Sequence, residues 1–146
     1  MAELVLVRHG QASFGTDDYD KLSELGWRQS RWLGEYFRER GTAFDLVVRG
    51  SLRRHAETLT GIAEGMGRLL EGAAKRVLVV SSGGPIATIL AEVLGMRPRG
   101  VVDLNLQTRN TGISELQAGA SRIHCVSFNN VPHLERPERA GALTYS

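Results

Sequence analysis

One stretch near the start of the chain constrains the fold more than any other. Leu4-Val5-Leu6-Val7 leads directly into Arg8-His9-Gly10. Consecutive apolar residues with no alternation are typical of a strand buried on both faces, as in a parallel sheet that helices cover. Ligands of open α/β sheets bind just beyond the carboxyl ends of the strands. The pattern therefore places Arg8, His9 and Gly10 where a ligand site is expected.

A second buried strand is predicted over Phe44–Arg49, and a helix over Ser51–Met66 follows it. Arg54 lies in the first turn of this helix, where a cation opposes the helix dipole. An anion-binding site would explain that unfavourable placement. We interpret His55, in the same turn, as a structural residue. The inward stripe of the helix is predicted to consist of Leu52, Ala56, Leu59, Ala63 and Met66.

A third buried strand is predicted over Arg76–Val80, and it leads into Ser82-Gly83-Gly84-Pro85 at the start of another helix. Proline suits the first turn of a helix. Two glycines between a strand and a helix allow backbone N–H groups to approach an oxyanion at the positive helix end. A third polar group is therefore expected at the same sheet edge as Arg8 and Arg54.

The remaining segments connect or flank these strands. Ser23 is a candidate N-cap for a helix that runs to about Arg40. The segments Gly112–Gln117 and Arg122–Phe128 alternate in polarity and predict an antiparallel hairpin. In the other segments the sequence predicts a brief helix within the connector 67–75, a short extended piece over 101–104, and a polar tail from Asn129 onward whose last residues are loose.

These elements predict a single domain over residues 1–146, of the α/β class. The expected architecture is a three-layer sandwich: a mostly parallel central sheet, helices on both faces, and a C-terminal antiparallel hairpin. A chain of this length buries enough surface to fold without a disulfide or a metal. The single cysteine cannot pair within the chain, and no Cys/His spacing resembles a zinc site. We therefore expect no metal and no cofactor.

The charge pattern bears on location and partners. The first residues form no basic n-region, and no apolar run approaches the length of a membrane span, so we expect a cytoplasmic protein without a membrane partner. Of the 18 basic residues, 16 are arginines, whose planar fork suits phosphate and carboxylate. They are scattered and not interleaved with aromatic residues, so no nucleic-acid partner is expected.

The polar groups that follow the three strands suit one chemistry. The two arginines, Arg8 and Arg54, can hold a phosphoryl group through forked, charge-assisted hydrogen bonds. A neutral His9 imidazole between them can attack phosphorus and hold the phosphoryl group covalently. The N–H groups of Gly83 and Gly84 can stabilise charge that develops on the phosphoryl oxygens.

On these motifs the sequence resembles the histidine phosphatase superfamily, also called the phosphoglycerate mutase-like family. The matching segments are residues 6–11, 22–26, 51–54 with Thr58, 79–86 and 130–134. The resemblance implies that His9 is the phosphoryl-accepting nucleophile and that Arg8 and Arg54 clamp the phosphate. It also implies a set of residues that bind phosphate or substrate: Gly10, Gln11, Ser13, Ser82, Gly83 and Gly84.

The sequence departs from the family pattern in two places. Many members have a second histidine where this chain has Ser82, whose hydroxyl donates a hydrogen bond but brings no positive charge. The family usually inserts a strand and lid helices, with a glutamate that protonates the leaving group, where this chain has only the connector 67–75. This short form is therefore expected to have impaired activity. Glu71 in the connector is predicted to lie at the amino edge of the sheet, too far from His9 to replace that acid.

The leading hypothesis is a metal-independent phosphomonoesterase that acts on a small phosphorylated metabolite or phosphoester through a phosphohistidine on His9. Two alternatives stay open: a phosphate-binding protein with little turnover, and a mutase-type phosphoryl transferase, which generally needs a closed site. A doubly wound nucleotide-binding protein is a weaker fit, because the chain has neither a Gly-x-Gly-x-x-Gly turn nor a Gly-Lys-Ser/Thr loop.

The resemblance also implies an order for the strands. Across the sheet this order is Phe44–Arg49, Arg76–Val80, Leu4–Arg8, Gly112–Gln117 and Arg122–Phe128. Phe44–Arg49 is then an apolar edge strand with no proline or lysine to discourage pairing. Such an edge recruits another strand, so we predict a homodimer that pairs through it.

Overall fold

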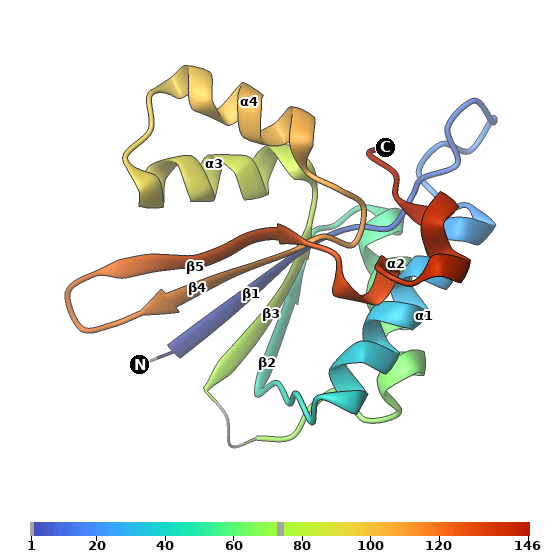
Figure 1. The fold of residues 1–146 in the computed structure, drawn as a ribbon, viewed down its shortest axis with the longest axis horizontal. Coiled ribbons are helices and arrows are strands. Elements are labelled where there is room, and N and C mark those ends of the chain that lie inside the picture. The colour runs from blue at the N-terminus through green and yellow to red at the C-terminus, as the bar shows by residue number, and fades with distance from the viewer. Residues whose placement is uncertain (1, 73–74) are drawn as a thin grey trace.

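The computed structural model describes residues 2–72 and 75–146, and its centre is a five-stranded sheet in the order β2-β3-β1-β4-β5 (Figure 1). β1, β3 and β2 run parallel, whereas β4 pairs antiparallel with β1 and β5 antiparallel with β4. The predicted strand order and the C-terminal hairpin are confirmed. The strands are β1 Ala2–Arg8, β2 Leu46–Arg49, β3 Arg76–Ser81, β4 Ile113–Ala118 and β5 Ile123–Asn130.

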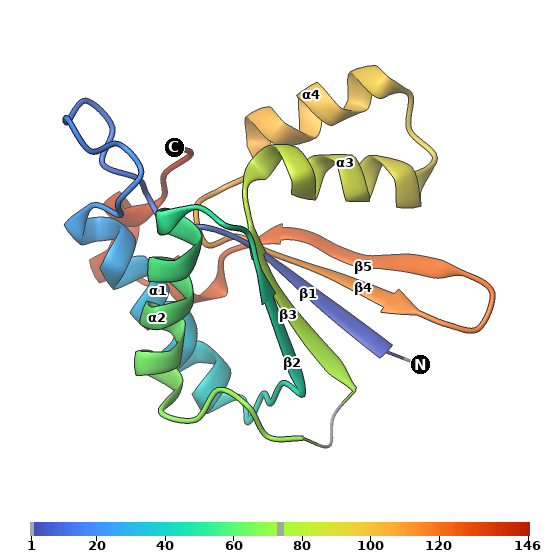
Figure 2. The ribbon, with the colours of Figure 1, turned by 180° about the vertical axis from the view of Figure 1, so that it is seen from behind.

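Helices cover both faces of this sheet, which confirms the three-layer α/β architecture. On one face lie α1 (Glu24–Glu39) and α2 (Arg53–Met66), and on the other lie α3 (Gly83–Leu94) and α4 (Pro98–Gln107). The two helix pairs stand on opposite sides of the sheet in both views (Figures 1 and 2). Two short 3₁₀ helices, Pro132–Leu134 and Pro137–Ala142, follow β5 and pack near α1.

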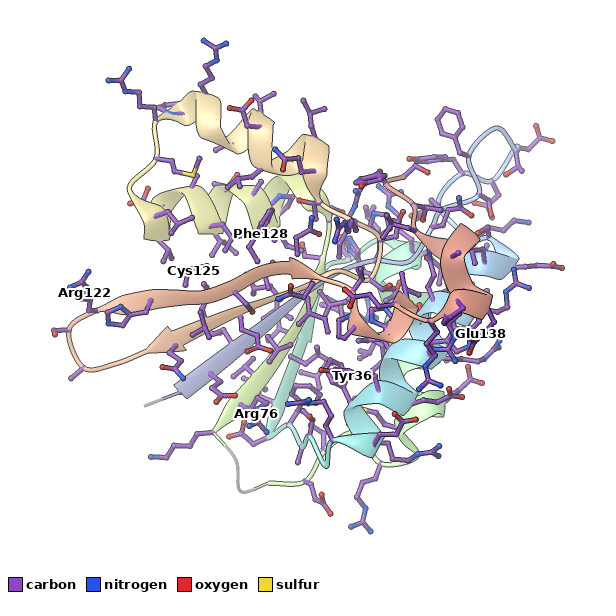
Figure 3. The ribbon with its side chains drawn as sticks, viewed as in Figure 1. Tyr36, Arg76, Arg122, Cys125, Phe128 and Glu138 are labelled. Atoms are coloured by element: carbon purple, nitrogen blue, oxygen red, sulfur yellow. The ribbon has the colours of Figure 1, made fainter. Side chains whose placement is uncertain are left out.

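Each face of the sheet contributes to its own apolar core. Val5 and Val7 of β1 pack beneath α1 and α2, whereas Leu6 packs beneath α3. Because successive side chains of a strand point to opposite faces, a strand covered on both sides is an unbroken apolar run. Figure 3 shows that the α3 side is closed in part by Cys125 and Phe128 of β5, which lie between that strand and the helix.

The predicted first helix is confirmed at its start. Ser23 is the N-cap of α1, and its hydroxyl oxygen accepts a hydrogen bond from the Gly26 N–H at 3.0 Å. Such a side-chain acceptor satisfies one of the N–H groups that a helix start leaves without a partner. Gly41, at φ +65°, follows the C-cap Arg40 and ends the helix close to the predicted position.

The prediction of an extended piece over 101–104 was wrong, because these residues lie within α4. Pro98 occupies the first turn of that helix, where its missing N–H leaves no hydrogen bond unmade. Leu104 packs against the core beneath α3. This tertiary burial outweighs the strand preference of the two β-branched residues Val101 and Val102.

The brief helix predicted in the connector is also absent from residues 67–72. Leu70 forms a parallel bridge with Phe44, and the Glu71 N–H donates to the Phe44 carbonyl at 2.8 Å. β2 itself begins only at Leu46. Pairing with the chain before β2 satisfies backbone groups that a single helical turn leaves open. Residues 73 and 74 of the connector lie outside the described residues.

The tail after Asn129, whose last residues are predicted to be loose, packs against α1. Its buried residues Val131, Leu134 and Ala142 form an apolar cluster with Leu25 and Trp32 of the helix. The Gln29 amide Nε2 donates to the Ala142 carbonyl at 2.7 Å, which anchors the end of the tail. These contacts hold the last residues beside the carboxyl end of β1, where the Ala12 N–H donates to the Ser146 carbonyl oxygen at 3.0 Å.

Candidate active site

His9 follows β1 at the carboxyl edge of the sheet and is only 3% exposed. Its Nδ1 lies 2.7 Å from the Gly10 carbonyl oxygen. Since a carbonyl only accepts, Nδ1 holds the proton and Nε2 has the lone pair. Burial lowers the pKa of His9 to about 3, with the charges of Arg8 and Arg54 acting in the same direction. The imidazole is therefore neutral at pH 7, the form that can attack phosphorus.

Arg8 precedes His9 and is held by the backbone of distant segments. Its Nη1 donates to the carbonyl oxygens of Thr108 and Tyr145, the latter at 2.8 Å. Its Nε is buried and has no hydrogen-bond partner among the described residues. Burial, and then the nearby Arg54 charge, lower the pKa of Arg8. An anion between the two guanidinium groups would relieve this repulsion and satisfy the unused Nε–H.

Arg54 stands in the first turn of α2, where Asp20 holds it. Its Nη1 donates to Asp20 Oδ1 at 3.1 Å, and the ring of Tyr19 lies 5.3 Å from its Cζ. Asp20 also accepts from the backbone N–H groups of Arg53 and Arg54, at 3.0 and 3.4 Å, and so caps a helix whose own N-cap, Leu52, offers no side-chain acceptor. The Arg54 Nε, like that of Arg8, is buried without a partner in the described part of the chain.

The start of α3 supplies backbone donors to the same edge of the sheet. Ser81 pairs with Arg8 across β3 and β1, so the next residues lie beside His9. Gly83 and Gly84 are the first residues of α3, and their N–H groups have no partner inside the helix. A Cβ on Gly83 would overlap Asn105 Oδ1 and lie 3.5 Å from Arg8 Cζ. A larger residue at position 83 would therefore displace the Asn105 side chain where α3 passes between α4 and the Arg8 guanidinium.

His55 is the residue of this site that sequence reasoning did not find. It is 4% exposed, its ring centroid lies 5.8 Å from that of His9, and its Nε2 lies 2.7 Å from Ser82 Oγ. Of the predicted stripe of α2, Met66 is buried, Leu52 is exposed, and the other three residues, Ala56, Leu59 and Ala63, are only partly buried. The buried face of α2 instead consists of His55, Thr58, Gly61, Ile62, Gly65 and Met66.

A signal for this rotation exists in the sequence. A Cβ on Gly61 would lie 2.6 Å from Ser30 Cβ, and one on Gly65 would overlap the Arg31 carbonyl oxygen, both on α1. The two glycines therefore mark the face on which the helices touch. His55 is seven residues before Ile62 and eleven before Met66, so at about 100° per residue it lies within about 20° of both on the buried face of the helix. The inward stripe of α2 thus combines glycines with large apolar residues.

Gly10, Gln11 and Ser13 lie after His9, and the first two are already engaged in hydrogen bonds. The Gly10 N–H donates to Thr58 Oγ1 at 2.9 Å, and Gln11 Oε1 accepts from the Ser23 hydroxyl at 2.7 Å. Ser13 is buried. The predicted role of these three residues in binding phosphate or substrate stays a prediction.

Glu71 lies at the amino end of β2, because its N–H donates to Phe44 just before that strand. β1 and β2 run parallel to β3, which lies between them. Glu71 is therefore at the amino ends of these strands, whereas His9 is at their carboxyl ends.

Among residues 2–72 and 75–146, no group of three or more His, Cys, Asp or Glu side chains is arranged to hold a metal ion. Within the same residues, no helix has the length and hydropathy needed to cross a membrane.

Comparison with protein families matches most of the chain. The family model of the histidine phosphatase superfamily (branch 1) matches residues 4–72 and 68–131. A 2,3-bisphosphoglycerate-dependent phosphoglycerate mutase of Methylorubrum extorquens (strain PA1) is 35% identical over 71 residues, which cover 44% of this chain and 34% of that protein. The chain thus matches about a third of the length of such curated relatives.

Solved structures share the fold at low sequence identity. A phosphoserine phosphatase from Entamoeba histolytica, in complex with 3-phosphoglyceric acid, gives a TM-score of 0.72 at 20% identity over 92% of this chain and 100% of that chain. A mycobacterial glucosyl-3-phosphoglycerate phosphatase with bound VO3 gives 0.68 at 18% identity, over 88% and 99%. The α-ribazole phosphatase of Shigella flexneri gives 0.70 at 14% identity, over 88% and 96%. Identities this low establish a common fold alone.

Proposed function

The chain belongs to the histidine phosphatase superfamily, and on that premise we propose that it is a metal-independent phosphomonoesterase that works through a phosphohistidine on His9. One observation supports this above all others. A buried, neutral imidazole has its lone pair on Nε2, and two nearby guanidinium groups each have a buried Nε–H with no partner in the described residues. Two unused cationic donors beside a neutral nucleophile suit a phosphate dianion.

In the first step, His9 Nε2 attacks phosphorus and the bond from phosphorus to the leaving oxygen breaks. Arg8 and Arg54 hold the phosphoryl oxygens, and the N–H groups of Gly83 and Gly84 stabilise the charge that develops on them. The Gly10 carbonyl accepts from Nδ1–H, which keeps the ring in the reactive tautomer and stabilises the cationic phosphohistidine. In the second step, water attacks phosphorus and releases inorganic phosphate and neutral His9.

The substrate is proposed to be a small phosphomonoester. The similar solved structures are named as phosphatases of phosphoserine, glucosyl-3-phosphoglycerate and α-ribazole phosphate, which are all small phosphorylated metabolites. The loop beside Arg54 bears the side chains of Phe14 and Tyr19, both exposed and in edge-to-face contact at 5.8 Å between centroids. A loop with exposed side chains beside Arg54 admits water to the site, which favours hydrolysis over a mutase reaction that must exclude water.

The test is phosphoenzyme formation with an aryl phosphate, p-nitrophenyl phosphate. Purified wild-type protein is expected to release p-nitrophenol and, after an acid-free quench, to retain an acid-labile, base-stable phosphoryl group on His9. His9→Ala should lose both signals, whereas His124→Ala, in an exposed position on β5, should retain them. Turnover at the wild-type rate by His9→Ala would refute the mechanism. Phosphate binding without any phosphoenzyme would instead favour a binding protein with little turnover.

A further inference from the structure

His55 is a buried imidazole for which the two-step reaction above has no role. Its Nε2 lies 2.7 Å from Ser82 Oγ, and its Nδ1 is buried without a hydrogen bond to any described residue. Burial of a polar ring that is only partly satisfied lowers stability. Such a group in a native structure calls for an explanation, and function is one.

The surrounding backbone is shaped to admit this ring. A Cβ on Gly50 would overlap His55 Nδ1, so any other residue at position 50 would displace the imidazole. His55 also follows Arg54 directly in the first turn of α2, and the Asp20 carboxylate caps that turn. The position of the ring is therefore set by the same helix start that sets the Arg54 guanidinium.

Ser82 follows the residue of β3 that lies beside Arg8 and His9. The preceding residue, Ser81, pairs with Arg8, and the His9 N–H donates to the Ser81 carbonyl at 2.9 Å. As the N-cap of α3, Ser82 makes no side-chain cap hydrogen bond, so its hydroxyl is available to His55. A hydroxyl both donates and accepts, so it can accept a proton on one side while it releases one on the other.

We propose that Ser82 and His55 form a proton relay, in which the Ser82 hydroxyl contacts the leaving oxygen and His55 acts through Ser82 as a positioning residue. The relay rests on the proposed function, because it needs phosphoryl transfer to His9. It supplies a route for the leaving-group proton at the carboxyl edge of the sheet. Glu71 is excluded from that task by its place at the opposite edge.

The proton balance closes over one cycle. As the His9–phosphorus bond forms and the phosphorus–oxygen bond breaks, the leaving oxygen takes the Ser82 hydroxyl proton, and Ser82 Oγ takes the Nε2 proton of cationic His55. The alcohol departs and His55 is left neutral. When water then attacks phosphorus and the His9–phosphorus bond breaks, a water proton passes to Ser82 Oγ while the Ser82 proton returns to His55 Nε2. The products are alcohol and inorganic phosphate.

The charges around His55 determine the pH at which the relay operates. Burial lowers the pKa of His55, as do the charges of Arg54 and Arg49, whereas the charge of Asp20 raises it. His9, the other titratable group that faces the ring, is neutral. A bound phosphate dianion favours the imidazolium and raises the pKa of His55 again. Turnover of alkyl phosphates should therefore fall as pH rises through this pKa, while aryl phosphates, whose leaving groups need little protonation, lose much less.

The experiment compares an alkyl with an aryl phosphate in the full-length protein. Initial rates and phosphoenzyme levels are measured from pH 4.5 to 8 with glycerol 3-phosphate and with p-nitrophenyl phosphate. Ser82→Ala and His55→Gln are expected to lower kcat for the alkyl phosphate about 10²-fold more than kcat for the aryl phosphate. Both variants should also lose the decline in alkyl turnover at rising pH. Ser121→Ala in the exposed hairpin turn and His124→Gln are the matched controls.

The outcomes separate the relay from the function on which it rests. Equal losses on the two substrates, or an alkyl pH profile that Ser82→Ala leaves in place, would overturn the relay while the phosphatase stands. Ser82→Ala decides the matter if His55→Gln fails to fold, because it removes only one hydroxyl, which makes no side-chain cap hydrogen bond to α3. A wild-type protein that forms no phosphohistidine with the aryl phosphate would overturn the proposed function itself, and the relay with it.

Discussion

Two buried histidines should make this fold sensitive to mild acid. His9 is 3% exposed and His133 is 2% exposed, and burial lowers the pKa of each to about 3. In an unfolded chain a histidine titrates near its ordinary value of about 6.5. Between about pH 6.5 and pH 3 the unfolded chain therefore binds protons that the native state excludes, so the free energy of unfolding falls as pH falls.

The size of this effect follows from the two pKa values. Below pH 6.5 each histidine removes about 1.4 kcal/mol of stability per pH unit, which amounts to about 2 kcal/mol per group between pH 7 and pH 5. The two groups together remove about 4 kcal/mol over that interval. Because a domain of this size has a total stability of about 5–15 kcal/mol, the loss is a large share of it.

His133 is the group to change, since it lies outside the proposed reaction. Its Nε2 is 2.8 Å from Thr111 Oγ1, and its carbonyl accepts from Arg139 Nη1 at 2.6 Å. His133→Gln removes the titrating ring and retains a side chain that can bond to Thr111. We expect the variant to start less stable at pH 7 but to lose about 2 kcal/mol less stability than wild type between pH 7 and pH 5.

The assay is urea unfolding at pH 7, 6 and 5, followed by far-ultraviolet circular dichroism, with the free energy extrapolated to water at each pH. His124→Gln, at the exposed position on β5, serves as the control and should keep the wild-type pH dependence. If His133→Gln and wild type lose the same free energy between pH 7 and pH 5, then His133 is not buried as a neutral ring and the reasoning is wrong.

Three further predictions concern phosphate binding, the missing acid and assembly. Arg54→Ala should raise the inhibition constant of inorganic phosphate about 10- to 100-fold, since a charged hydrogen bond contributes roughly 1.5–3 kcal/mol. The control Arg122→Ala, in the hairpin turn, should leave this constant unchanged, and an unchanged constant in Arg54→Ala would place Arg54 outside the phosphate site. Glu71→Gln should leave the pH–rate profile unaltered, because Glu71 lies at the amino ends of the parallel strands and His9 at their carboxyl ends. Loss of the acidic limb of the profile in this variant would contradict that placement. We also predict a homodimer that pairs through the edge strand β2, where Leu46 is 53% exposed. Light scattering should detect the dimer and Leu46→Lys should dissociate it, whereas a wild-type monomer at high concentration would rule it out.

Much of this architecture follows from the order of residues alone. Each of the three parallel strands is a short apolar run that ends in polar or glycine residues, so its limits can be predicted locally. Parallel strands end at one edge of the sheet, which is why Arg8, Arg54 and Ser82 could be grouped before any fold was known. The start of α1 followed from Ser23, because a helix cap is a contact between near neighbours in sequence.

Only the tertiary structure decided which groups lie around His9. The inward face of α2 depends on where the glycines of that helix meet α1, and a contact between two helices exists only in the tertiary structure. The helix α4 packs against α3, and the tail packs against α1. Thr108, which follows α4, and Tyr145 in the tail supply the carbonyl groups that hold Arg8. Local patterns set strands, caps and turns because their energies arise between sequence neighbours. The contacts that complete this site join residues as much as 137 positions apart, and their energies exist only after the layers have packed.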